Sequence, residues 1–189
     1  MLVITPEMML SYPHLDKAQP GQKPTDKAKF SATLVSDPGA DLKPLEAAVV
    51  AAGEEKWPGK FAEMVRIGAL RLPFRKDAEA KGYTPGSIFI NVRSEQKPGV
   101  VYRHAGADNK PAIVPDDKIR EVAYPGERVR AQIRAFAYDS NGNRGVSFAL
   151  NNVQIMGNGT APRLDNRQAA TDAFEADLNA APASLQGLI

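Results

Sequence analysis

The chain contains the stretch Arg128-Val-Arg-Ala-Gln-Ile-Arg-Ala-Phe-Ala-Tyr138, in which aliphatic side chains alternate with cationic, amide or aromatic ones. Successive side chains of a β-strand point to opposite faces of a sheet, so this stretch predicts a strand with two unlike faces. One face carries Val129, Ala131, Ile133, Ala135 and Ala137. The other face carries Arg128, Arg130, Gln132, Arg134, Phe136 and Tyr138. The first set suits a core and the second suits a surface.

A hairpin turn is predicted directly after this strand. Asn141-Gly142 favours a type I′ turn, because both of its central residues need positive φ. Centring the turn there pairs Ala137 with Val146, Ala135 with Phe148 and Ile133 with Leu150. The apolar sides of both strands then share one face, and a slip of one residue would destroy that agreement. On the opposite face Phe136 lies across from Ser147, and Arg134 from Ala149, so we expect the ring and the guanidinium to be uncovered.

The polar face of this hairpin is the main indication of function. Three guanidiniums and two aromatic rings in one row can meet phosphates and unstacked bases together, as in proteins that bind single-stranded nucleic acid. The alternative is a solvated sheet face with two incidental aromatic rings, which is common on protein surfaces.

Further elements are indicated along the chain. A short strand at 2–4 is followed by a loop that contains Pro20-Gly21. A helix is expected over 41–52, with Asp41 as its N-cap and Gly53 as its stop, and a second helix after Trp57-Pro58-Gly59. The apolar phase of the last strand shifts at Asn151-Asn152, which suggests a β-bulge. Other predicted strands are 28–35, 87–93, 100–102 and 112–114, and a last helix is predicted at about 166–178.

This element count predicts a mainly β protein with inserted helices. Its most economical architecture is an OB-fold, a five-stranded curved barrel with extensions, and a β-sandwich is the alternative. We expect an OB-fold domain over 1–164, with an N-terminal extension and helices inserted at about 41–66. Residues 165–189 are expected to form a C-terminal helix and a flexible tail.

Composition and charge agree with an ordinary globular domain. Hydrophobic residues make up 43% of the 189 residues and charged residues 24%, with no cysteine. No apolar run approaches the roughly 20 residues of a membrane helix, and the start does not resemble a signal peptide. Residues 165–189 hold four carboxylates against one cation, so the small net charge of +2 comes from a basic body with an acidic end.

No pattern in the chain indicates catalysis. We place His14 and His104 in loops, and neither lies in a metal-binding motif. Gly157-Asn158-Gly159 lacks the rest of a phosphate loop and is interpreted as a turn. The adjacent carboxylates Asp116-Asp117 and Glu54-Glu55 would point apart. We therefore predict no enzyme, no metal site and no cofactor.

Several segments together resemble a known family. They are Ser11-Tyr-Pro-His-Leu15, Lys29-Phe-Ser-Ala-Thr-Leu34, Leu72-Pro-Phe-Arg-Lys-Asp77, Pro85-Gly-Ser-Ile-Phe-Ile-Asn91, Tyr124-Pro-Gly-Glu127 and Gly145-Val-Ser-Phe-Ala-Leu-Asn-Asn-Val-Gln154. Over about residues 10–175 they resemble the DUF2815 family of phage-encoded single-stranded DNA-binding proteins. The resemblance implies an OB-fold without catalytic activity that acts in phage DNA replication, recombination or repair, in the cytoplasm of an infected bacterial host. The implied partners are single-stranded DNA and phage replication or recombination proteins, and no membrane.

One feature departs from many single-strand binders, which end in a strongly acidic tail with an apolar tip. The end of this chain is only weakly acidic, and its carboxylates lie well before Leu188-Ile189. This departure argues against partner recruitment through the tail.

The phase of the predicted strands assigns the DNA-binding residues. The expected phosphate contacts are Lys29, Arg93, Arg128, Arg130 and Arg134. Phe136 and Tyr138 are the first candidates for base stacking, with Phe89 and Tyr102 as second candidates. The single tryptophan, Trp57, is interpreted as a core or capping residue rather than a stacking one. Two alternative functions are a phage structural or carbohydrate-binding β-module that uses the same aromatic face, and a small nucleotide-processing enzyme.

Overall fold

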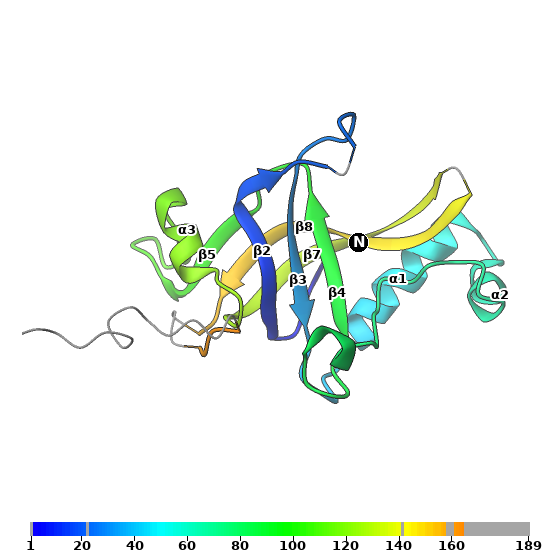
Figure 1. The fold of residues 1–189 in the computed structure, drawn as a ribbon, viewed down its shortest axis with the longest axis horizontal. Helices are drawn as coiled ribbons and strands as arrows, with labels where there is room; N and C mark the ends of the chain where they lie inside the picture. Colours follow the sequence, from blue (N-terminus) through cyan, green and yellow to red (C-terminus); the bar gives the residue numbers. More distant parts are fainter. Residues whose placement is uncertain (1, 22, 141, 158–160, 165–189) are drawn as a thin grey trace, which may run out of the picture.

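The computed structural model describes residues 2–21, 23–140, 142–157 and 161–164, and these form a mainly β structure with short helices (Figure 1). Its strands are β1 (Leu2–Ile4), β2 (Met8–Gln19), β3 (Lys29–Val35), β4 (Phe89–Ser94), β5 (Gly99–Ala105), β6 (Pro111–Ile113), β7 (Arg128–Ser140) and β8 (Asn143–Ile155). Its α-helices are α1 (Lys43–Lys56), α2 (Phe61–Arg66) and α3 (Ile119–Val122), and two 3₁₀ turns lie at Glu79–Lys81 and Asp116–Lys118.

The strand pairings close on themselves. β7 pairs with β8, β8 with β4, β4 with β3, β3 with β2, and β2 again with β7. All of these ladders are antiparallel except that of β4 with β8. Side chains that point into this circuit form the main core, among them Met8, Leu10, Leu34, Ile90, Val92, Ile133 and Phe148. β5 and β6 extend the sheet beyond the circuit, with β5 parallel to β8.

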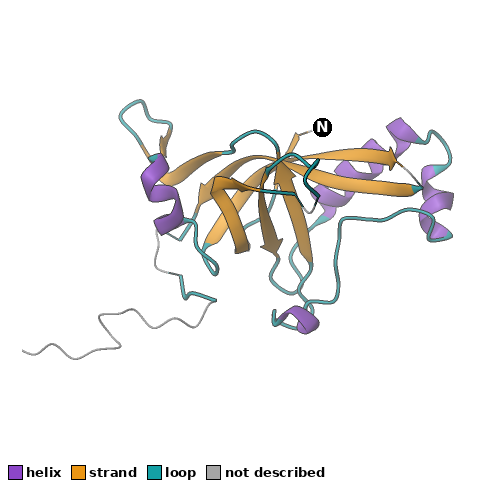
Figure 2. Cartoon of the chain, turned by 45° about the horizontal axis from the view of Figure 1, so that its top comes forward, coloured by secondary structure: helices purple, strands orange, loops and turns teal. Residues whose placement is uncertain are grey.

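The hairpin of β7 and β8 has the predicted register. Ala137 pairs with Val146, Ala135 with Phe148, Ile133 with Leu150, Phe136 with Ser147, and Arg134 with Ala149. The predicted bulge is also confirmed, since Ile133 pairs with Leu150 while Gln132 pairs with Asn152, which leaves Asn151 without a partner in the ladder. The long end of this hairpin extends past the other strands and lies beside α1 and α2 (Figure 2).

β2 corrects the prediction of a loop between residue 4 and the strand at 28–35. Twelve residues, Met8–Gln19, form a strand paired with β3. The register shifts between Ser11 and His14 and again between His14 and Gln19, so the side chains do not alternate regularly. For this reason the sequence lacks the alternation of apolar and polar residues that would have predicted this strand. The loop assignment of both histidines was also wrong, because His14 lies in β2 and His104 in β5.

The first helix differs from its prediction at both ends. Leu42 is its N-cap, while the Asp41 carboxylate accepts a hydrogen bond from the Lys43 N–H at 3.0 Å without capping the helix. Gly53 does not stop the helix. It lies buried within α1, where the Phe61 ring of α2 packs against it so closely that a side chain would collide with the ring. Trp57 follows as the C-cap residue and packs against the main core, as predicted.

A segment between α2 and β4 runs alongside β8 of the hairpin and forms a parallel bridge with it. The Arg71 N–H donates to the Arg144 carbonyl at 3.0 Å, and the Val146 N–H donates to the Arg71 carbonyl at 2.9 Å. Arg71 thereby bridges to Gly145, the residue directly opposite Tyr138. This short seam covers part of the outer edge of β8 and holds the long arm of the hairpin.

None of the helices among the described residues is long and apolar enough to span a membrane. The helix predicted at about 166–178 lies outside the described residues. The division of the chain at residue 164 stays a prediction.

Candidate nucleic-acid interface

A groove of about 1130 Å³ crosses the outer face of the circuit, over the hairpin and the end of β4. We call it the hairpin groove. Its cationic side chains are Lys29, Arg93, Lys97 and Arg134, and its aromatic rings include Phe136 and Tyr138. Glu95 is the one carboxylate among the described residues that line it. Lys97 is held in an ion pair with Asp116 at 2.6 Å. The groove therefore offers more positive charge than negative charge, next to aromatic surface.

The ladders explain why these residues meet. Arg134 of β7 pairs with Ala149 of β8, which pairs with Arg93 of β4. Arg93 pairs with Ser31 of β3, and Ser31 pairs with His14 of β2. Directly paired residues share one face of a sheet, so these side chains form one row around the outside of the circuit. Ala149 and Ser31 are the small members of the row, and they leave both guanidiniums uncovered.

The aromatic part of the groove lies one step further along the hairpin. The ring centroids of Phe136 and Tyr138 are 6.5 Å apart and their planes are inclined at 51°. The side chain of Phe136 is 40% exposed, while Tyr138 is half-buried. Two rings on one strand face, both accessible from the groove, can each take the face of an unstacked base.

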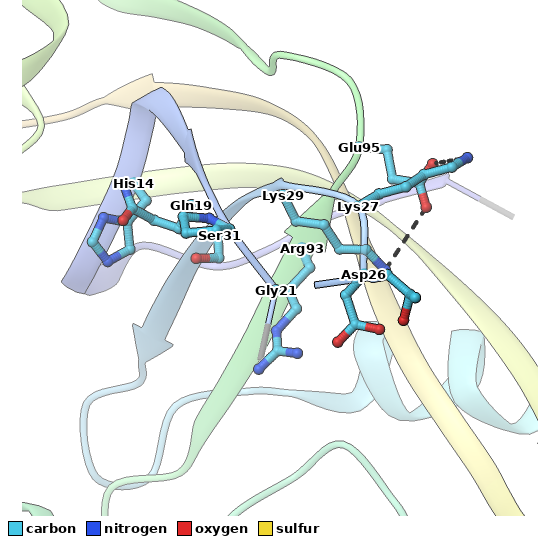
Figure 3. A pocket seen from close by; sticks show the side chains of 11 residues that line it. His14, Gln19, Gly21, Asp26, Lys27, Lys29, Ser31, Arg93 and Glu95 are labelled. Carbon is cyan, nitrogen blue, oxygen red and sulfur yellow. Dashed lines mark hydrogen bonds and ion pairs between the residues drawn. The ribbon is translucent and has the colours of Figure 1, made fainter. Parts of the chain in front are cut away.

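A second depression, of about 680 Å³, adjoins the hairpin groove beneath the β2–β3 loop (Figure 3). We call it the loop depression, and it shares Lys29, Arg93 and Glu95 with the hairpin groove. Glu95 forms ion pairs with Lys27 at 2.9 Å and with Lys29 at 3.8 Å. The hydrogen bond from Lys27 is the main reason why the pKa of Glu95 lies below its ordinary value. An ionised carboxylate therefore lies among the cations where the two depressions meet.

Five of the nine predicted site residues line the hairpin groove together. They are Lys29, Arg93, Arg134, Phe136 and Tyr138. The structure does not bring the other four into this groove.

Phe89 is a core residue. Its side chain is only 5% exposed, and its ring packs edge-on against Tyr83 at 5.5 Å in a small second core with Val35 and Ala78. The predicted phase was correct, since Phe89 points away from the main core. The segment around residues 78–83 covers that face, however, so the ring is not available to a base.

Arg128 lies at the opposite end of β7 and is already paired with acids. Its guanidinium contacts Asp37 at 2.6 Å and Glu7 at 3.1 Å, and its side chain is only 26% exposed. The hydrogen bond to Asp37 is the largest of the causes that raise the pKa of Arg128. This arginine ties three segments together, and its positive charge is balanced by the two carboxylates.

Arg130 and Tyr102 are also outside the groove. Arg130 is exposed on the same strand face as Arg134, and it pairs with Gln154 on β8. Tyr102 of β5 pairs with the buried Ile155 of β8 and packs against the main core. Its ring stacks on His104, with centroids 4.8 Å apart.

Two residues of β2 were missed as site residues. Tyr12 is 67% exposed, and with His14, Ser31 and Arg93 it lines a small depression of about 200 Å³ next to the groove. The bulged register of β2 concealed their position from a strand-phase argument. The one available signal was an aromatic residue directly before a proline, Tyr12-Pro13, in an otherwise polar segment.

Among the described residues, no group of three or more histidine, aspartate or glutamate side chains is placed to hold a metal ion.

Comparison with known proteins gives a family and a fold. The model of a family described as "Enterobacter phage Enc34, ssDNA-binding protein" matches residues 1–183. The comparisons indicate no enzyme family. No curated protein matches the chain.

Solved structures with the same fold are distant in sequence. The single-stranded DNA-binding protein of bacteriophage Enc34, with a C-terminal truncation, is 20% identical with a TM-score of 0.58, over 85% of this chain and 88% of that chain. The same phage's protein in complex with ssDNA is 22% identical with a TM-score of 0.55, over 82% and 85% of the two chains. The gp2.5 single-stranded DNA-binding protein of bacteriophage T7 is 11% identical with a TM-score of 0.59, over 89% and 97%.

Proposed function

The chain belongs to the family described by the ssDNA-binding protein of Enterobacter phage Enc34, and from this membership we propose that it binds single-stranded DNA in the hairpin groove. The family is one of phage single-stranded DNA-binding proteins, as the sequence resemblance implied. The narrower resemblance, to DUF2815, stays a prediction. We further propose that the protein acts during phage DNA replication, recombination or repair in the cytoplasm of the infected host, together with phage replication or recombination proteins.

We assign the fold as an OB-fold, and the strand circuit supports this assignment. In chain order, β2, β3, β4, β7 and β8 are the first to the fifth strands of the circuit. Around the circuit their order is first, second, third, fifth, fourth, and back to the first. The parallel pair is the third with the fifth, β4 with β8. OB-folds bind oligonucleotides over their second and third strands, between the loops that follow the first and fourth strands. The corresponding parts of this chain are β3, β4, the β2–β3 loop and the β7–β8 turn, which surround the hairpin groove and the loop depression.

The observation that carries the proposal is the row formed by Arg134 and Arg93, with Phe136 exposed beside it. Guanidiniums at the positions of Arg93 and Arg134 can contact successive phosphates as charge-assisted hydrogen-bond donors. Phe136 and Tyr138 then take the bases that a single strand leaves unpaired. Stacking of this kind tolerates every base, because every base has a π-face, so we propose binding without strong sequence preference.

The role of the protein is to hold the strand and shield it, and no reaction step is involved. A phage structural or carbohydrate-binding module, the alternative from the sequence, would not need the excess of cations over carboxylates in the groove. Its binding would also depend little on salt.

The salt dependence of binding tests the proposal. Fluorescence anisotropy with an oligothymidine should show that the logarithm of affinity falls linearly with the logarithm of salt concentration, by roughly 0.7 for each phosphate contact. The double variant Arg93→Gln/Arg134→Gln should reduce that slope by about 1.4. Arg75→Gln/Arg103→Gln is the matched control, because both of these arginines are exposed and neither lines the groove. Equal slopes for the two double variants would refute the assigned groove.

A further inference from the structure

A separate depression of about 610 Å³ lies on the other side of β2, away from the hairpin. The second half of β2, α3 and the segment Tyr124-Pro125 form its walls. Among the described residues that line it, the cations are Lys17, Arg120 and Arg163, and the one carboxylate is Asp16. The Arg163 guanidinium lies over the Tyr124 ring, 4.6 Å from its centroid. We call this surface the α3 depression. It is cationic and partly aromatic like the hairpin groove, but none of the residues that the structure describes lines both.

A small connecting depression joins the two surfaces. Arg93 lines both the hairpin groove and the connecting depression. Tyr12 and His14 line both the connecting depression and the α3 depression. The ladder row from Arg134 through Arg93 and Ser31 ends at His14, so the path follows paired strands. Tyr12 lies on the same strand as His14, and both line the connecting depression.

Tyr12 has an unusual backbone at this junction. Its φ is +45°, in the left-handed region that bulky residues rarely adopt, and it precedes Pro13, which favours an extended conformation. Its ladder is bulged here, because Ser11 pairs with Thr33 while His14 pairs with Ser31. The result is a ring that is 67% exposed between two cationic surfaces. Strained residues of this kind concentrate at binding sites, where the conformation serves the ligand.

We propose that a single DNA strand bound in the hairpin groove continues past Tyr12 into the α3 depression. A base stacks on Tyr12, and Lys17 and Arg120 contact the phosphates that follow. The inference rests on the proposed function and lengthens the stretch of DNA that the protein contacts. A single strand fits this path because consecutive unpaired bases can meet aromatic rings that lie on different strands of the protein.

The dependence of affinity on DNA length tests the extension. Oligothymidines from about 4 to about 16 nucleotides cover the range of site sizes of OB-folds. Tyr12→Asn removes the ring while keeping a residue that tolerates the left-handed backbone. We expect it to bind the shortest oligonucleotides as the unchanged protein does and to lose about tenfold in affinity for the longest ones. Tyr12→Phe, which keeps the ring, should retain the full affinity at every length.

The charges of the α3 depression are tested in the same way. The double variant Lys17→Gln/Arg120→Gln should weaken the binding of the longer oligonucleotides only. For these it should reduce the slope of log affinity against log salt concentration by about 1.4. Lys81→Gln/Arg103→Gln is the control, because both residues are exposed and neither lines the groove or the α3 depression.

The outcomes separate the extension from the proposed function. The extension is wrong if Tyr12→Asn has no effect at any length, or if it weakens short and long oligonucleotides equally. In either case Phe136→Ala, measured on the shortest oligonucleotides, shows whether the hairpin groove itself binds DNA. If Phe136→Ala lowers the affinity and Tyr12→Asn does not, only the extension is wrong. If neither variant lowers the affinity, both the extension and the proposed DNA site in the hairpin groove are wrong.

Discussion

Phe136 lies directly across the β7–β8 ladder from Ser147, and its ring remains 40% exposed. A larger partner at position 147 would cover the ring, because directly paired side chains contact one another. The small residue therefore keeps an aromatic surface open beside the cations of the groove.

Replacing Phe136 by alanine should weaken binding to an oligothymidine by about tenfold, since one stacked base contributes roughly 1–3 kcal/mol. Fluorescence anisotropy at constant salt measures the change. Ile67→Ala is a suitable control, because Ile67 is another exposed apolar side chain but lies outside the groove. If both variants bound like the unchanged protein, Phe136 would have no part in the site.

Replacing Glu95 by glutamine should strengthen binding. Its carboxylate lies close to Lys27 and Lys29, and a low pKa keeps it ionised at neutral pH. The substitution removes a charge that repels phosphates and frees both lysines, so affinity at low salt should rise and the salt slope should steepen by about 0.7 for each lysine that gains a phosphate. Glu121→Gln, which breaks the exposed ion pair with Lys118 outside the groove, should leave both quantities unchanged. A weaker complex in the Glu95 variant would contradict this account.

Replacing Gly145 by alanine should destabilise the fold by about 1–3 kcal/mol, the usual cost of overpacking. A Cβ at this position would collide with the Arg71 carbonyl oxygen and would lie 2.9 Å from the Tyr138 hydroxyl. The seam that holds the hairpin arm would have to open. Chemical denaturation measures the free energy of unfolding. Gly99→Ala is the matched control in another strand, because its Cβ would meet the flexible end of Asn152. We expect the smaller loss there.

High pH should destabilise the protein through Tyr124. Burial is the main cause that raises the pKa of Tyr124 from 10.0 to about 12, and the hydrogen bond and negative charge of Glu127 raise it further. The folded state thus favours the neutral phenol. The associated stability is complete below the ordinary pKa and is lost as the pH rises through the folded one. Thermal melting between pH 10 and 12 should show a decline that is smaller in Tyr124→Phe. The pKa of Tyr83 is also raised by burial, so ultraviolet titration of the unchanged protein should show late-titrating tyrosines, of which Tyr124→Phe lacks one.

The hairpin could be predicted from the sequence because everything that fixes it is local. Strict alternation in β7, the Asn141-Gly142 turn and the phase shift at Asn151 together determine register and bulge. β2 could not be predicted in this way, since its bulges at Tyr12 and beyond interrupt the alternation.

The predicted site residues Phe89 and Arg128 lie outside the groove for a common physical reason. Whether Phe89 is exposed depends on the segment around Tyr83, which packs over that face of the sheet. Whether Arg128 is free depends on Glu7 and Asp37, which are 121 and 91 residues away in the chain. Strand phase gives the face of a side chain, but it does not give the distant segment that covers or neutralises it.

The pairing of the first strands with β7 has a consequence for how the protein folds. The Ala131 N–H donates to the Thr5 hydroxyl across 126 residues of chain, and Met8 pairs with Val129. Contacts between residues so far apart require a long loop to close first, which slows folding. On the ribosome, β1 can pair with β7 only after β7 has emerged, so the circuit of strands closes only once β7 and β8 have been synthesised.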